Sequence, residues 1–128
     1  MIYQTIYTNS APEPIGPYSQ ATEIFNKRII FISGQIGLNP STGNLVSENF
    51  EDQVHQAIEN IRTVIEAAGG NINNIVKYTL FLTDLNKFSL VNSIMHEIFK
   101  KPFPSRSTIE AKGLPKGAQF EIEAIAAI

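Results

Sequence analysis

The chain has 128 residues, of which 43% are hydrophobic, and its formal net charge is −2 at pH 7. A chain of this length fits one compact domain with one core, so we expect a single domain over residues 1–128. The slightly acidic charge argues against a nucleic-acid surface, no apolar run is long enough to cross a membrane, and the lack of cysteine excludes disulfides and thiolate metal sites.

Three short strands are predicted in the N-terminal third. Residues 2–8 alternate loosely and predict the first strand, and the loop at 9–17 carries three prolines and a glycine. Residues 18–25 predict the second strand, and the β-branched and aromatic run at 28–34 predicts a third. We expect the second and third strands to pair as a hairpin. No secretory signal pattern follows Met1, so the expected location is the cytoplasm.

An amphipathic helix is predicted from residue 50 onward. Asn49 is its predicted N-cap, and Gly69 with Gly70 supplies its C-cap. Apolar residues recur every three or four positions along one face of this helix: Phe50, Val54, Ile58, Ile61, Ile65 and Ala68.

The second half of the chain returns to strand composition at residues 75–83. Asp84 can cap a second helix, which Pro102 ends, and strands at 105–112 and 119–127 follow around the LPKG turn. The predicted order is therefore β-β-β-α-β-α-β-β, an α+β fold with two helices on one face of a mixed sheet. The apolar stripe of the second helix consists of Phe88, Val91, Met95 and Ile98.

Neither face of the strand at 75–83 is plainly a water face. One face carries Ile75, Lys77, Thr79 and Phe81, and the other carries Val76, Tyr78, Leu80 and Leu82. Two helices cover one side of such a sheet, so we expect another subunit to cover the other side; the alternative is a modest exposed apolar patch. In the last strand, Phe120, Ile122, Ala124 and Ala126 share a face, and Gln119, Glu121 and Glu123 lie on the opposite one.

Few residues in this sequence suggest catalysis by themselves. The common nucleotide-binding, zinc-protease and serine-hydrolase motifs are missing, and no cluster of residues suggests a metal site or a bound cofactor. His55 and His96 fall on separate helices and are predicted to be solvated. Asp84, Glu51 and Asp52 fit helix caps and first-turn charges.

Arg106 is the strongest candidate for a binding residue. Pro102 and Pro104 stiffen the chain just before it, and the planar guanidinium can grip a carboxylate through two parallel hydrogen bonds. A small carboxylate ligand is the natural partner. The alternative is a structural ion pair between Arg106 and Glu121 or Glu123.

Several stretches of the sequence resemble the RidA family, also called YjgF, the reactive intermediate deaminases. They occur in the family's order and cover nearly the whole chain: IGPYSQA at 15–21, ISGQIGLNPSTG at 32–43, EAAGG at 66–70, FLTDLNKFSLVN at 81–92, FPSRST at 103–108 and LPKGAQFEIEAIA at 114–126. The resemblance implies chorismate-mutase-like subunits that assemble as a homotrimer around a central barrel, with clefts between neighbouring subunits. It also implies hydrolysis of enamines and imines such as 2-aminoacrylate to 2-keto acids and ammonia, with no cofactor or metal.

The resemblance also assigns residues by position. Arg106 matches the arginine that binds the substrate carboxylate, Glu121 the glutamate that holds the attacking water, and Tyr18 the tyrosine of the cleft. Further matches line the pocket: Ser33, Gly34 and the backbone at Thr108, with Phe88 and Asn92 forming a wall. Thr108 stands where many members have a cysteine or another small residue, and Met95 where many have a tyrosine.

Two rival functions remain open from the sequence. Some members of the family are described as translation inhibitors with endoribonuclease activity, which the acidic pI of about 5.6 disfavours. Others are proposed as ligand sensors, and a trimer that only binds 2-keto acids would use Arg106 in the same way as an enzyme. Replacing Glu121 by glutamine separates the deaminase from the binding trimer, because ligand binding should survive in both and only an enzyme would lose turnover.

Overall fold

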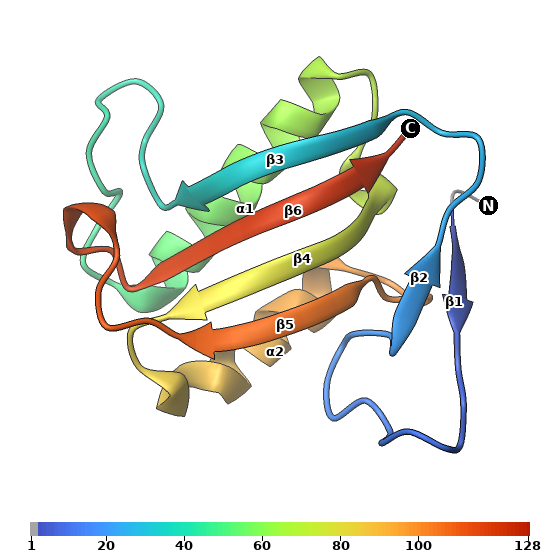
Figure 1. Cartoon of the computed structure of the whole chain (residues 1–128). Coiled ribbons are helices and arrows are strands. Elements are labelled where there is room, and N and C mark those ends of the chain that lie inside the picture. Colours follow the sequence, from blue (N-terminus) through green and yellow to red (C-terminus); the bar gives the residue numbers. More distant parts are fainter. Residues whose placement is uncertain (1–2) are drawn as a thin grey trace.

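The computed structural model describes residues 3–128, and it has the element order predicted from the sequence (Figure 1). Residue 2 of the first predicted strand lies outside the described residues. The strands are β1 (Gln4–Ile6), β2 (Ala21–Glu23), β3 (Ile29–Ile36), β4 (Ile75–Leu82), β5 (Ser105–Glu110) and β6 (Phe120–Ala127). The helices are α1 (Phe50–Ala67) and α2 (Phe88–Ile98), with short 3-10 turns at η1 (Ile72–Asn74), η2 (Leu85–Lys87) and η3 (Pro115–Gly117).

A four-stranded mixed sheet in the order β3-β6-β4-β5 forms the centre of the fold. β6 runs antiparallel to both β3 and β4, whereas β5 runs parallel to β4. The last two strands of the chain are therefore not neighbours, because β4 lies between them. This placement separates the side chains of β5 from those of β6.

The predicted hairpin of the second and third strands is wrong. β2 pairs with β1 in a separate two-stranded sheet, and β3 pairs with β6 instead. Tyr3, which precedes β1, is buried in a small cluster with Val76 and Ala127 at the edge of the main sheet. Burial of this ring holds β1 there, and β2 pairs with β1.

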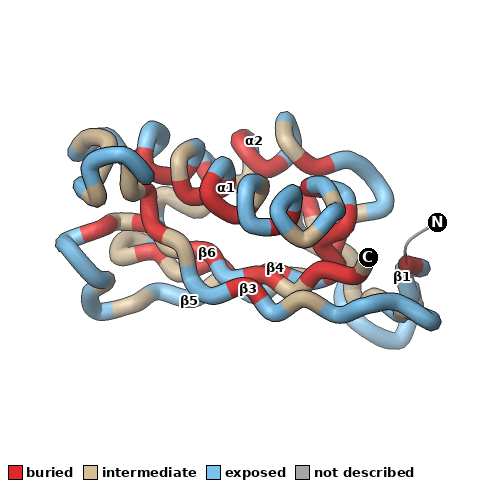
Figure 2. The backbone as a smooth tube through the Cα atoms, turned by 90° about the horizontal axis from the view of Figure 1, so that it is seen from above, coloured by how far each residue is buried: buried red, intermediate tan, exposed pale blue. Residues whose placement is uncertain are grey.

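Both helices cover the same face of the main sheet, and the core lies between the two layers (Figure 2). Asn49 caps α1 by accepting a hydrogen bond from the backbone N–H of Asp52, as predicted. Gly69 adopts φ +93°, and the backbone bonds from Gly69 to Glu66 and from Gly70 to Ile65 close the helix as a Schellman motif.

The start of α2 differs from the prediction. Asp84 caps η2 by accepting a hydrogen bond from the N–H of Asn86. α2 begins only at Phe88, and the side chain of its N-cap residue, Lys87, makes no capping hydrogen bond. A short 3-10 turn thus separates the predicted cap from the helix. Of the predicted stripe, Val91 and Met95 are buried, whereas Phe88 and Ile98 are half-buried.

A register shift in β4 corrects the predicted division of its two faces. The pairing with β6 is irregular between Ile75 and Lys77, so Ile75 joins the core under the helices, whereas Val76 packs with the Tyr3 cluster. Tyr78, Leu80 and Leu82 lie in the core as expected. On the opposite face Lys77 is exposed and Phe81 is half-buried.

The helix-free face of the sheet carries several exposed apolar side chains. Phe31 is 77% exposed, Ile109 48% and Ile29 39%. In Figure 2 both helices lie on the other side of the sheet, and no helix of residues 3–128 covers this face. Among the helices of residues 3–128, none is both long and apolar enough to cross a membrane.

We predict that Gly37 cannot be replaced by alanine without loss of stability. A Cβ at this position would lie 2.7 Å from Cα of Gln53 and 2.8 Å from its carbonyl oxygen, so the end of β3 packs directly on the backbone of α1. Gly37→Ala should lower the free energy of unfolding by about 1–3 kcal/mol in urea denaturation. Gly113→Ala is the matched control, because nothing lies within 4 Å of its Cβ position. Equal stability of the two variants would contradict the direct packing of β3 on α1.

Candidate active site

Arg106 lies on the edge strand β5, and its side chain extends along the helix-covered side of the sheet. Its Nη1 donates a hydrogen bond to Oδ1 of Asn92 on α2 at 2.7 Å. Its Cζ lies 4.8 Å from the ring centroid of Tyr18 and 5.2 Å from that of Phe88, within the range of cation–π attraction. Arg106, which is predicted to bind a carboxylate, is therefore in contact with three other residues predicted to line the site: Tyr18, Phe88 and Asn92.

Arg106 forms no ion pair within residues 3–128. The salt bridge in this part of the chain joins Arg62 to Glu59. The predicted alternative, a pair with Glu121 or Glu123, is therefore wrong for a single chain. Burial lowers the pKa of Arg106, and the nearby Tyr78 and Tyr18 oppose that shift. The guanidinium stays charged at neutral pH, so a partly buried cation with free N–H donors is available to an anionic ligand.

The loop at residues 15–19 presents Tyr18 through a set of fixed backbone bonds. The N–H of Tyr18 donates to the carbonyl of Gly16 at 2.8 Å, and the N–H of Ser19 donates to the carbonyl of Pro104 at 2.9 Å. The Ser19 hydroxyl donates to the carbonyl of Phe103. The loop is thereby tied to the segment that leads into Arg106.

Gly16 lies where this loop approaches Arg106. A Cβ on Gly16 would lie 2.9 Å from Nη2 of Arg106 and 3.2 Å from the amide atoms of Asn92. A side chain at this position would therefore displace the guanidinium or the Asn92 amide from the arrangement seen here. In the sequence, Gly16 is marked only by its place in a proline-rich loop and in the IGPYSQA stretch.

Glu121 belongs to a second group of predicted site residues, on the opposite side of the sheet. Its neighbours Phe120 and Ile122 are in the core, so Glu121 faces the helix-free side, and no hydrogen bond to its carboxylate is found within the described chain. A Cβ on Gly34 would lie 2.1 Å from Oε2 of Glu121. Ser33 and Gly34 form the irregular segment of β3 where the pairing with β6 shifts register.

Thr108 lies two residues beyond Arg106 on the same side of β5. Its hydroxyl is buried and has no hydrogen-bond partner among the described residues. An unpaired buried hydroxyl costs about 1–3 kcal/mol, so a ligand or a partner chain that bonded it would recover that cost. Thr108 therefore extends the polar surface next to the guanidinium.

The structure thus brings the predicted site residues together as two half-sites. The first half-site, comprising Arg106, Tyr18, Phe88, Asn92 and Thr108, lies between β5, α2 and the loop at 15–19. The second half-site consists of Glu121, Ser33 and Gly34. β4 lies between the strands that carry Arg106 and Glu121, and the two side chains point to opposite faces.

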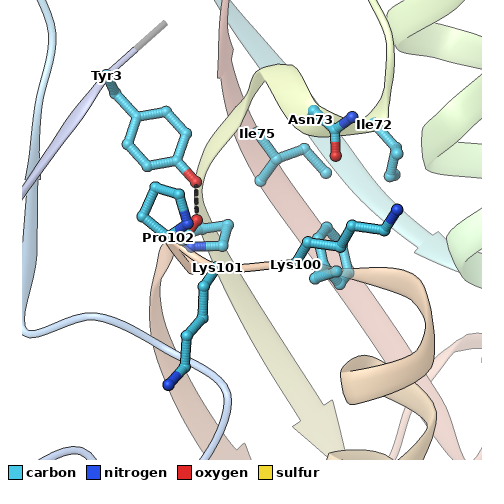
Figure 3. Close-up of a pocket in the computed structure, with 9 residues that line it drawn as sticks. Tyr3, Ile72, Asn73, Ile75, Lys100, Lys101 and Pro102 are labelled. Atoms are coloured by element: carbon cyan, nitrogen blue, oxygen red, sulfur yellow. Dashed lines mark hydrogen bonds between the residues drawn. The ribbon is translucent and has the colours of Figure 1, made fainter. Parts of the chain in front are cut away.

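Two open grooves border the first half-site, and one of them, of about 530 Å³, is lined in part by Arg106. The other groove, of about 510 Å³, runs beside Tyr18 and is lined by apolar side chains that include Tyr7, Pro14 and Phe103. A smaller cavity of about 280 Å³ lies between η1 and residues 99–104 (Figure 3). There the hydroxyl of Tyr3 donates to the carbonyl of Pro102 at 2.7 Å, and none of the predicted site residues lines this cavity.

The histidines contribute to neither half-site. His55 and His96 are exposed on α1 and α2, as expected for solvated helix positions. Within residues 3–128 no group of three or more histidine, aspartate or glutamate side chains is arranged to hold a metal ion.

The chain is similar over nearly its whole length to known proteins. The family model described as Endoribonuclease L-PSP matches residues 8–128. Human 2-iminobutanoate/2-iminopropanoate deaminase is 45% identical, over 98% of this chain and 90% of the human protein. The RutC family protein PH0854 of Pyrococcus horikoshii is 44% identical over 96% of each chain.

Solved structures agree with this similarity. RidA from an Antarctic Psychrobacter bacterium superposes with a TM-score of 0.76 at 42% identity, covering 98% of this chain and 99% of that one. TdcF from E. coli, solved with bound serine, gives a TM-score of 0.74 at 37% identity and covers 98% of both chains.

We predict that Gly34→Ala displaces the Glu121 carboxylate with little effect on stability. The added methyl group would collide with the end of a flexible side chain that can turn away. The ¹³C resonance of the Glu121 carboxyl should therefore shift, whereas the free energy of unfolding should change by less than about 0.5 kcal/mol. An unchanged Glu121 resonance would show that the carboxylate does not rest on Gly34.

We also predict that stability falls as the pH rises above the ordinary pKa of tyrosine. Burial raises the pKa of Tyr78, with a smaller opposing effect of Arg106, and burial also raises the pKa of Tyr3. The unfolded chain loses these protons near pH 10.0 while the folded chain retains them, so alkaline pH favours unfolding. Tyr78→Phe and Tyr3→Phe should each flatten the decline between about pH 9 and pH 11 in urea titrations. If the stability of both variants declined with pH in parallel with the wild type, the raised pKa values of Tyr78 and Tyr3 would be contradicted.

Proposed function

Since the chain belongs to the Endoribonuclease L-PSP family, which contains the YjgF and RidA proteins, we propose that it is a deaminase of small 2-imino acids. The substrates are 2-iminobutanoate, 2-iminopropanoate and their enamine tautomers, and the products are 2-keto acids and ammonia. The observation that carries this proposal is the partly buried Arg106, held by Asn92 and two aromatic rings with no carboxylate partner in its own chain. The cytoplasmic location expected from the sequence is part of the same proposal.

In this proposal Arg106 binds the substrate carboxylate. One N–H of the guanidinium is used by Asn92, which fixes its plane and leaves other donors for two parallel bonds to the carboxylate. Tyr18 and Phe88 limit the water around the ion pair, and the Thr108 hydroxyl and backbone are available for a further bond. A carboxylate here offsets the cost of burying the unpaired cation.

The chemistry then requires one water molecule and one base. An iminium carbon is already electrophilic, so positioning the substrate and orienting water supplies most of what the reaction needs. Glu121 accepts a proton as the water oxygen bonds to C2 of the iminium, and it returns this proton to the nitrogen of the carbinolamine. As the C–N bond breaks, the hydroxyl proton passes to Glu121, the keto group forms and ammonia leaves, and the proton on Glu121 is then released to ammonia or solvent. The enamine tautomer enters the same reaction by taking up a proton from solvent at C3, which converts it into the iminium. No redox step or group carrier takes part in this sequence.

The site is completed by a second copy of the chain. Arg106 and Glu121 point to opposite faces of one sheet, so one substrate meets both only where the first half-site of one copy faces the second half-site of another. The exposed Phe31 and Ile109 favour burial of the helix-free face in such an assembly. We propose a homotrimer with a central barrel and a cleft at each subunit boundary.

Two other functions are distinguished by the same residues. A trimer that only binds 2-keto acids would use Arg106 but would not need Glu121 as a base. Endoribonuclease activity, after which the family is named, is disfavoured because His55 and His96 are exposed on separate helices and the net charge is −2.

We predict that Glu121→Gln abolishes turnover but preserves binding. With 2-aminoacrylate generated in situ by a serine dehydratase, pyruvate release above the spontaneous rate should fall by about 10²- to 10⁴-fold. The Kd for 2-oxobutanoate should stay within about threefold of the wild-type value, whereas Arg106→Ala should raise it by more than about tenfold.

Glu59→Gln and Arg62→Ala are the matched controls, because this pair lies on the exposed side of α1. Both controls should retain wild-type turnover and binding. A wild-type protein that does not accelerate the reaction, yet binds 2-oxobutanoate through Arg106, would replace the deaminase proposal with the binding function. Full turnover in Glu121→Gln would remove Glu121 from the mechanism.

A further inference from the structure

Tyr78 carries a hydroxyl group into the centre of the core. The residue is 0% exposed, and its ring stacks on Phe99, with centroids 5.1 Å apart and planes 26° apart. The hydroxyl donates a hydrogen bond to the carbonyl oxygen of Pro17 at 3.0 Å. A buried hydroxyl is costly to leave unpaired, so its hydrogen bond restrains the group that accepts it.

This bond fixes one end of the peptide group between Pro17 and Tyr18. The carbonyl of Pro17 and the N–H of Tyr18 belong to the same planar unit, and that N–H donates to the carbonyl of Gly16 at 2.8 Å. Both polar groups of the plane are thereby satisfied. The direction in which the Tyr18 side chain leaves the backbone follows from the orientation of this plane.

Adjacent strands of the sheet carry Arg106 and Tyr78, and Tyr78 holds the peptide that precedes Tyr18. Tyr78 on β4 is the register partner of Arg106 on β5, and the Tyr18 ring lies 4.8 Å from Cζ of Arg106. Tyr78 itself cannot reach a substrate, since it is fully buried. Its hydroxyl lies close enough to Arg106 to affect the pKa of that residue, but its hydrogen bond goes to Pro17, so its hydrogen-bonded route to the site runs through the Pro17–Tyr18 peptide.

We propose that Tyr78 is a positioning residue, whose hydroxyl holds the Pro17–Tyr18 peptide so that the Tyr18 ring packs against Arg106 and pre-orders the guanidinium for a carboxylate. A pre-ordered guanidinium loses less conformational entropy when the ligand binds. The consequence for turnover rests on the proposed deaminase function. The consequence for Arg106 itself does not.

Tyr78→Phe tests this inference, because it removes the hydroxyl and keeps the ring that stacks on Phe99. The arginines of the chain are Arg28, Arg62 and Arg106, so the Nε–H signal of Arg106 can be assigned in an NMR spectrum by its loss in Arg106→Lys. Ring currents from Tyr18 and Phe88 act on this proton. We expect Tyr78→Phe to shift the signal and to raise the Kd of 2-oxobutanoate roughly three- to tenfold. The KM of the imine should rise by a similar factor, with kcat within about twofold of the wild type.

Tyr3→Phe is the matched control. Tyr3 is also buried, at 8% exposure, and its hydroxyl also donates to a proline carbonyl, that of Pro102, but not to the Tyr18 loop (Figure 3). We expect this variant to leave the Arg106 signal and the Kd unchanged.

An unshifted Arg106 signal with an unchanged Kd in Tyr78→Phe would overturn the inference, and so would equal effects of the two variants. A Tyr78→Phe chain that fails to fold would assign the hydroxyl to stability instead. If the wild type lacks deaminase activity, only the KM and kcat expectations fall, because the NMR signal and the Kd report on Arg106 directly.

Discussion

α1 and α2 bury one face of the main sheet, and this burial determines the direction in which each strand side chain points. Tyr78, Leu80 and Leu82 of β4 pack into that layer, as do Phe120 and Ile122 of β6. Because strand side chains alternate, every residue between these core positions points to the other face. Glu121 is therefore directed away from the helices by the same pattern that buries its two neighbours. Arg106 stays on the helix side because β5 is an edge strand, where a long side chain can run beside α2 without being enclosed.

The first half-site combines several groups whose polar capacity is not met within one chain. The guanidinium of Arg106 is partly desolvated and has one hydrogen bond to Asn92, and the Thr108 hydroxyl has none among the described residues. Native cores usually satisfy such groups. Their concentration beside two aromatic rings distinguishes this site from the exposed Arg62–Glu59 pair, in which opposite charges meet on the surface. The carboxylate of the proposed substrate would satisfy the guanidinium.

Periodicity predicted the order of the elements because core burial governs that pattern directly. It therefore identified both helices, the Asn49 cap and the buried face of β6. It could not predict which strands pair, because β2 and β3 have similar compositions and the choice depends on the burial of Tyr3 with Val76 and Ala127. The register shift at Ile75 is likewise a property of two strands together.

For the site, family resemblance selected residues that the structure places in two groups. Tyr78 shares one face of an apolar strand with Leu80 and Leu82, and nothing local in the sequence marks its hydroxyl as a partner of a residue 61 positions away.

The division of the site between two faces of the sheet has a consequence for how the protein responds to dilution. On the proposed assembly, no folded chain carries a complete site, and each cleft exists only while two copies remain in contact. The dissociation constant of the assembly then sets the lowest concentration at which the reaction proceeds. Dilution below it would abolish catalysis while every chain kept its secondary structure, its core and its Arg106 half-site.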